Sequence, residues 1–107
     1  MLHVHATPVF VDVDPENLCM DPQDLSRVLT SKTKAIMPVH LYGHPAEMPT
    51  IMRFAEEHGL FVIEDAAQSH GARLGDKCVG SLGHCGTFSF YGNKNVTTGE
   101  GGMITTN

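Results

Sequence analysis

Three apolar segments alternate with two amphipathic helical patterns in the first part of the chain, and the links between them are short. The apolar segments are residues 8–14, 34–40 and 60–63, and the helical patterns are residues 22–30 and 48–58. β-branched and aromatic residues favour strands, and strands that alternate with helices form parallel sheets. The order therefore predicts an α/β fold with a largely parallel sheet. Ligands of such sheets bind beyond the carboxyl ends of the strands.

The expected helices carry specific start and stop signals. Asp21 is a candidate N-cap, Pro22 suits the first helical position, and Asp24 stands where a capping-box acid belongs. Gly59 is expected to end the second helix. Pro38 argues against the strand that contains it, because proline has no backbone N–H, but the continuous apolar character still favours a strand.

From residue 69 onward the composition changes. Glycines interrupt residues 69–86 too often for a helix. A short strand is expected over residues 87–90, a long polar loop over residues 92–102 and a further strand over residues 103–106. This part of the chain thus extends the sheet and supplies loops, rather than a third helix.

Composition argues against several classes of function. The chain has 107 residues, which suits one small domain, and 12 Asp and Glu against 7 Lys and Arg give a formal net charge of −5. An acidic balance without a basic cluster argues against a nucleic-acid or anionic-membrane surface. No apolar stretch of the sequence approaches the roughly 20 residues of a membrane-spanning helix, and no secretion signal is visible. The expectation is a soluble, cytoplasmic protein.

The cysteines and histidines do not form a recognisable metal site. Three cysteines, odd in number and widely spaced, predict neither a disulfide framework nor a zinc site. They are Cys19, Cys78 and Cys85. Two histidine pairs have spacings that a metal could use, but no carboxylate or cysteine completes either ligand set, so no metal is expected. The pairs are His3 with His5 and His40 with His44.

Two positions could carry chemistry on residue type and placement alone. Asp65 follows an expected buried strand. A carboxylate at such a position either caps the next turn or pairs with a cation or hydrogen-bond donor, which a ligand could supply. Lys94 lies in a loop five residues after Ser89. The lysine could form a Schiff base and the serine could hold a phosphate, or the lysine is a solvated surface charge. No GxxxxGK[ST] motif is present, so a Walker A nucleotide site is not predicted.

Four sequence strings stand in one register along the second half of the chain. They are VIEDAAQSHGA at residues 62–72, GSLG at 80–83, FSFYGNK at 88–94 and TTGEGG at 97–102. Together they resemble the DegT/StrS family of PLP-dependent sugar aminotransferases. Residues 6–13 and 38–43 agree with the same family, so the resemblance covers nearly the whole chain. The residues at 91–94 and 97–103 are most similar to the perosamine synthetase-like branch, which aminates 4-keto-6-deoxy sugars.

The resemblance implies a fold, a cofactor and roles for five residues. The fold is the large domain of the PLP-dependent transferase fold type I (aspartate aminotransferase-like), and the cofactor is pyridoxal 5′-phosphate (PLP). By the resemblance, Asp65 pairs with the pyridine nitrogen, Gln68 lies near the phenolic oxygen and Ser89 binds the phosphate. Lys94 forms the Schiff base and moves the proton, and His70 is a candidate substrate contact. A sister branch with histidine in place of Lys94 performs deoxygenation, so the lysine favours transamination.

The implied reaction moves an amino group from an amino acid, commonly glutamate, to a nucleotide-linked keto-sugar. Residues 1–107 correspond to part of the PLP-binding large domain, with an N-terminal segment and the C-terminal small domain absent, and are expected to be inactive alone. The full-length protein is expected to be a homodimer.

Two other hypotheses stay open on the residues themselves. One is a non-enzymatic α/β module that binds a phosphate ligand, and the other is a zinc-dependent hydrolase built on the histidines. Tyr42 and Glu100 are further candidates for the border of the pocket, with structural or solvated roles as the alternative.

Overall fold

The computed structural model describes residues 2–106, which form a four-stranded sheet of order β1-β2-β5-β6 and a separate two-stranded hairpin. The sheet strands are β1 (Ala35–Ile36), β2 (Phe61–Asp65), β5 (Cys85–Ser89) and β6 (Gly102–Thr106). Strands β1, β2 and β5 run parallel, and β6 runs antiparallel to β5. The prediction of a largely parallel sheet is therefore confirmed.

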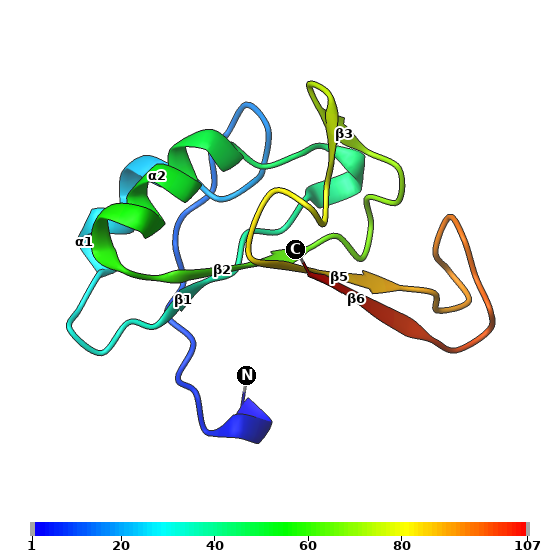
Figure 1. Ribbon diagram of the computed structural model, residues 1–107, viewed down its shortest axis with the longest axis horizontal. Helices are drawn as coiled ribbons and strands as arrows, with labels where there is room; N and C mark the ends of the chain where they lie inside the picture. The colour runs from blue at the N-terminus through cyan, green and yellow to red at the C-terminus, as the bar shows by residue number, and fades with distance from the viewer. Residues whose placement is uncertain (1, 107) are drawn as a thin grey trace.

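The two faces of the sheet differ in what covers them. Val62 and Glu64 of β2 are fully buried. Val62 shares an apolar cluster with residues of α2, so Val62 and Glu64, two residues further along the strand, face the side of the sheet on which α2 lies in Figure 1. Because side chains alternate along a strand, Phe61 and Asp65 point to the opposite side. Phe61 is 64% exposed and Ile104 of β6 is 69% exposed. We call the first side the helix-covered face and the second the open face.

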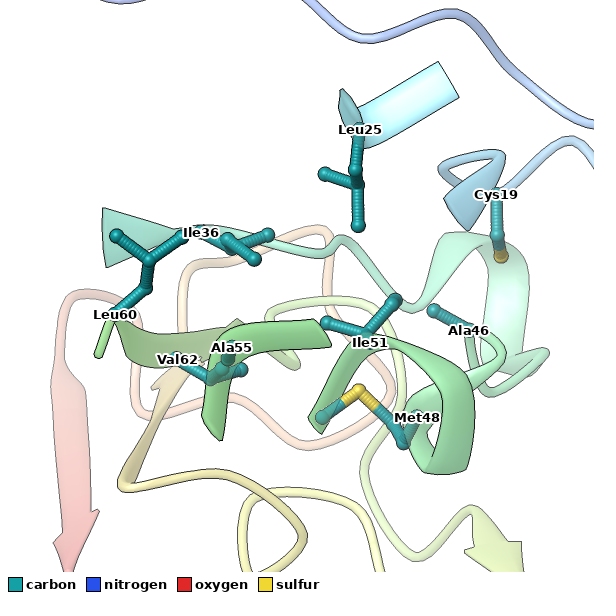
Figure 2. Close-up of a cluster of buried hydrophobic side chains, with 9 residues drawn as sticks. All are labelled: Cys19, Leu25, Ile36, Ala46, Met48, Ile51, Ala55, Leu60 and Val62. Atoms are coloured by element: carbon teal, nitrogen blue, oxygen red, sulfur yellow. The ribbon is translucent and has the colours of Figure 1, made fainter. Parts of the chain in front are cut away.

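Helix α2 (Met48–His58) packs the core against the helix-covered face. Its buried residues Met48, Ile51 and Ala55 join Val62 in one apolar cluster, which Figure 2 shows between the helix and the strands. The helix ends at Gly59, which has a left-handed φ of +64° and donates its N–H back to the last turn. The expected second helix and its stop signal are confirmed.

The expected first helix is wrong in its length. A 3₁₀ helix, η2 (Pro22–Asp24), is followed by a four-residue α-helix, α1 (Leu25–Val28), and the chain is extended again at Leu29. Asp21 is the N-cap as expected, because its Oδ1 accepts from the Gln23 N–H at 2.9 Å. The capping-box interpretation of Asp24 is wrong, because the Asp24 carboxylate accepts from the Asp12 N–H and from Arg27 instead.

The strand expected over residues 8–14 is also wrong. Val9 and Phe10 are 63% and 85% exposed, and of residues 8–14 only Val13 takes part in a β-bridge within the described chain, to Met20. Strand-forming side chains are not sufficient here, because no neighbouring strand of the described chain lies beside this segment to pair its backbone.

The expected strand over residues 34–40 is interrupted at Pro38. Only Ala35–Ile36 forms β1, since Pro38 has no N–H to donate. The chain nevertheless continues beside β2, because the Asp65 N–H donates to the Pro38 carbonyl at 2.9 Å and the His40 N–H donates to the Asp65 carbonyl at 3.0 Å. Residue 40 is thereby held at the carboxyl end of β2.

Residues 69–86, which we call the glycine segment, contain a hairpin that was not predicted from the sequence. Strand β3 (Arg73–Leu74) pairs antiparallel with β4 (Lys77–Cys78), and Gly75 lies between them at a φ of +59°. No helix in residues 2–106 is long and apolar enough to cross a membrane.

Candidate active site

Asp65 and Ser89 project from the same face of the sheet. Asp65 of β2 is paired in register with Thr87 of β5, and Ser89 lies two residues further along β5. In-register partners share a face and side chains alternate, so both side chains point to the open face. One strand spacing and two residues of rise separate their Cα atoms by roughly 8 Å. The carboxylate and the hydroxyl can therefore hold two ends of one small ligand.

The Asp65 carboxylate is half-buried and fixed by its own turn. Its Oδ1 accepts from the Ala67 N–H at 3.0 Å, which is the turn-capping alternative that the sequence left open. Within the described residues no donor approaches Oδ2. The cap orients the side chain and leaves one oxygen for a cationic donor from a ligand.

Lys94 lies in an ordered loop beyond the carboxyl end of β5. The loop is closed by a bond from the Phe90 N–H to the Gly101 carbonyl at 2.8 Å, and its first turn by a bond from the Lys94 N–H to the Tyr91 carbonyl at 2.9 Å. The Lys94 side chain is half-buried and has no ion-pair partner among residues 2–106. Its amine is therefore not committed to a carboxylate of the described chain.

Gln68 belongs to the same end of the sheet. It follows β2 by three residues, is exposed, and accepts from the Tyr42 N–H at 3.4 Å through Oε1. Tyr42 in turn lies three residues beyond Val39, which forms a bridge with Asp65. The structure thus brings the segment after residue 39 and the segment after residue 65 together.

His70 packs against side chains that alternate with Ser89 along the chain. Its ring packs against Phe88 and Phe90, with centroid distances of 5.4 and 5.3 Å. Phe88 alternates with Ser89 and contacts the glycine segment on the helix-covered face. Both ring nitrogens of His70 are buried without a hydrogen-bond partner in the described chain. The structure does not bring His70 together with the other predicted site residues.

Glu64 is the buried acid that sequence reasoning missed. It is 0% exposed, and its Oε2 accepts from His40 Nε2 at 2.8 Å. Three backbone N–H groups complete the set, those of Gly80, Leu82 and Gly83, at 2.8, 2.7 and 2.6 Å. Burial alone would raise the pKa of Glu64, but the bonds from His40 and the amides outweigh it and hold this pKa below 4.5, its ordinary value.

The geometry also fixes the tautomer of His40. Nδ1 accepts from the Ala46 N–H at 3.0 Å, so the ring proton sits on Nε2 and is donated to Glu64. The Ser69 hydroxyl donates to the His40 carbonyl at 2.5 Å. Through these bonds Glu64 and His40 join β2, the residues just before α2 and the glycine segment, on the side of β2 opposite to Asp65. Period-2 alternation after buried Val62 was the signal that could have found Glu64.

The histidines and cysteines are not assembled for metal binding in the described chain. No group of three or more His, Cys, Asp or Glu side chains within residues 2–106 could hold a metal ion. His84 has a backbone role, because its Nδ1 accepts from the Val62 N–H at 3.0 Å. Cys19, Cys78 and Cys85 are free thiols.

The donor set fits a phosphorylated pyridine aldehyde. Asp65 could pair with a protonated ring nitrogen, Ser89 could hold a phosphate, and the uncommitted amine of Lys94 could bond an aldehyde carbon. The three side chains come from β2, β5 and the loop after β5, at the carboxyl ends of parallel strands where ligands of such sheets bind.

Comparison with known proteins gives matches along the whole chain. Residues 1–107 match the DegT/DnrJ/EryC1/StrS aminotransferase family. The chain is 58% identical over 102 residues to GDP-perosamine synthase of Caulobacter vibrioides, covering 95% of this chain and 28% of that protein. It is 52% identical over 107 residues to UDP-N-acetyl-3-dehydro-alpha-D-glucosamine 3-aminotransferase of Acidithiobacillus ferrooxidans, covering 99% of this chain and 29% of that protein.

A solved structure shows the same fold. The aminotransferase from Psychrobacter cryohalolentis superposes with a TM-score of 0.96 at 50% sequence identity, covering 99% of this chain and 27% of that one. The expected fold class, that of the PLP-dependent transferases of fold type I, is confirmed. The chain spans less than a third of the length of each of these relatives.

Proposed function

This chain belongs to the DegT/DnrJ/EryC1/StrS aminotransferase family, and from that premise we propose that the full-length protein is a PLP-dependent sugar aminotransferase. It moves an amino group from an amino acid, for which we propose glutamate, to the keto group of a nucleotide-linked sugar. Two relatives with nucleotide-sugar names support the substrate class. The 58% identity to a GDP-perosamine synthase favours a 4-keto-6-deoxy sugar within that class.

One observation carries the proposal: Asp65 and Ser89 lie on the same open face of the sheet, and the loop with Lys94 follows directly after Ser89. When bound, PLP supplies an electron sink that stabilises negative charge on the substrate carbon. Asp65, oriented by the Ala67 N–H, holds a proton on the pyridine nitrogen. The hydrogen-bonded network behind β2 keeps this strand end in place, because Glu64 is anchored by His40 and three amides.

Ser89 and Lys94 divide the remaining work. The Ser89 hydroxyl, at the end of β5, binds the phosphate and anchors the cofactor at one end. Lys94 would hold the cofactor through its Nζ until an amino donor took its place. The free Nζ would then act as a base that moves a proton between the substrate carbon and the C4′ carbon of the cofactor. The half-buried position of Lys94 and its freedom from ion pairs in the described chain suit both tasks.

Borohydride reduction of the PLP-loaded full-length protein, followed by peptide mapping, tests the assignment. The cofactor is expected on Lys94, and Lys94→Ala is expected to lose the visible absorbance of bound cofactor. Lys77→Ala, an exposed lysine of β4, is the matched control and should keep that absorbance. Label on any other lysine would overturn the role of Lys94. Failure of the wild-type protein to take up PLP would favour the non-enzymatic phosphate-binding module.

The domain organisation follows from the same premise. We assign residues 1–107 to the PLP-binding large domain, with an N-terminal segment and a C-terminal small domain supplied elsewhere in the full-length protein. The 28% coverage of GDP-perosamine synthase supports this assignment. A homodimer is the proposed state, and light scattering of the full-length protein tests it, a monomeric mass being the contrary result.

A further inference from the structure

Tyr42 occupies a backbone conformation that does not suit it. The His44 N–H donates to the Leu41 carbonyl at 2.9 Å, and the two central residues have positive φ, +51° for Tyr42 and +87° for Gly43. These values define a type I′ turn, whose first central position favours Asn, Asp or Gly. A bulky side chain there is strained unless something compensates.

Nothing in the described chain compensates for Tyr42. Its side chain is 83% exposed, and within residues 2–106 the ring makes no aromatic contact and the hydroxyl makes no hydrogen bond. His5 and Leu18 also have positive φ, but among these three residues only Tyr42 bonds a candidate site residue. A strained, exposed aromatic residue beside a site is a candidate for ligand contact.

The turn lies at the end of the sheet that carries the candidate site. Figure 1 shows the 41–44 turn and the orange 91–101 loop on the side toward which β2 and β5 point. The Tyr42 N–H donates to Gln68 Oε1 at 3.4 Å, and Val39, three residues earlier, bridges to Asp65. In the proposed function Gln68 lies near the phenolic oxygen of PLP. That oxygen is on the ring carbon next to the one that carries the reacting group, so Tyr42 borders the reacting centre.

We propose that Tyr42 is a substrate-contact residue whose ring packs against the pyranose of the nucleotide-linked sugar. The inference rests on the proposed function and adds one residue of specificity to it. An uncharged ring with a polar tip matches the C–H face and the hydroxyls of a sugar. A small charged amino acid instead requires a cationic partner. Tyr42 therefore acts on the acceptor and not on the donor.

The substitution Tyr42→Asn separates contact from support. Asn tolerates the left-handed region, so the turn should keep its shape and Tm should stay equal or rise, while the ring is lost. We expect the Kd of the PLP-loaded full-length protein for GDP-perosamine, measured by calorimetry, to rise roughly 10-fold. The rate at which glutamate bleaches the visible absorbance should stay within about twofold of the wild-type rate, because the Tyr42 ring contacts the sugar acceptor and not the amino donor.

Leu18→Asn is the matched control, since Leu18 also has a positive φ of +60° and is 51% exposed. It should leave sugar binding unchanged. Unchanged sugar binding in Tyr42→Asn would overturn the inference, and so would a lower Tm accompanied by weaker PLP binding, which marks a structural role. If the wild-type protein binds PLP but no nucleotide sugar, the substrate class fails together with Tyr42. If it binds no PLP, the proposed function itself fails.

Discussion

A fully buried carboxylate needs its charge balanced by donors, and Glu64 has four of them. Glu64→Gln places an amide N–H₂ against groups that are themselves donors. We expect the free energy of unfolding of the full-length protein to fall by about 2–4 kcal/mol, because buried donors lose their acceptor. Denaturant unfolding measures the change. Glu57→Gln, on the exposed side of α2, is the control and should be near neutral. Equal stability of the two variants would contradict the buried network.

The same carboxylate predicts a pH dependence. The pKa of Glu64 in the folded chain is lower than 4.5, its ordinary value, so folding favours the charged form. The stabilisation is therefore complete above the unfolded pKa and is lost as the pH falls through the folded pKa. The stability gap between wild type and Glu64→Gln should be constant above about pH 6 and narrow below pH 4.5. A gap that widens on acidification would contradict this sign.

The candidate site could be predicted from the sequence only in part. Asp65 is conspicuous because it follows an apolar strand, whereas the roles of Ser89 and Lys94 came from the resemblance of the surrounding motifs to a known family. The hydrogen bond between Glu64 and His40 was missed because the two residues lie 24 positions apart, and nothing local to either residue signals the contact. His70 was named as a candidate substrate contact from the family resemblance, and its packing against Phe88 and Phe90 could not be foreseen from the sequence. The face on which a side chain lies depends on register, which the sequence did not reveal.

At the scale of elements, the glycine segment meets the sheet by close backbone approach. Gly80 has a φ of +83°, and a Cβ there would stand 2.5 Å from the Phe88 ring. Gly75 has a φ of +59° with open space around it. Gly75→Ala should thus lower the free energy of unfolding by about 1 kcal/mol, because of backbone strain alone. Gly80→Ala should carry the same strain and lower it by about 1–3 kcal/mol more, because the added Cβ overpacks against Phe88. Thermal unfolding of both variants measures the difference, and equal losses would show that Phe88 yields freely.

The elements that were predicted correctly carry local signals for their whole length. Helix α2 has a complete apolar face and a glycine stop, so its own residues signal where it begins and ends. The segment over residues 8–14 has the composition of a strand but no pairing partner in the described chain, and composition cannot supply one. The β3–β4 hairpin was missed for the opposite reason, since two-residue strands are too short for an alternating pattern.

At the scale of the whole molecule, the sheet is covered on one face only in the described chain. The helix-covered face holds the apolar cluster of Figure 2, whereas Phe61, Val39 and Ile104 on the open face are 64%, 39% and 69% exposed. An exposed apolar patch around a site marks a surface that is covered in the functional state. In the proposed full-length protein, residues outside 1–107 and the bound cofactor are available to cover it.

A covered open face would make its apolar side chains more important for stability than their exposure in residues 2–106 indicates. Phe61→Asp or Ile104→Asp, made in the full-length protein, should lower the free energy of unfolding by about 3 kcal/mol, because a covered apolar side chain becomes a charge. Leu18→Asp removes an apolar side chain that is 51% exposed in a left-handed turn, and it should change stability by less than about 1 kcal/mol. Denaturant unfolding of the three variants distinguishes the cases. Near-neutral effects at Phe61 and Ile104 would mean that the open face stays in solvent, and that Asp65 and Ser89 meet their ligand on an uncovered sheet.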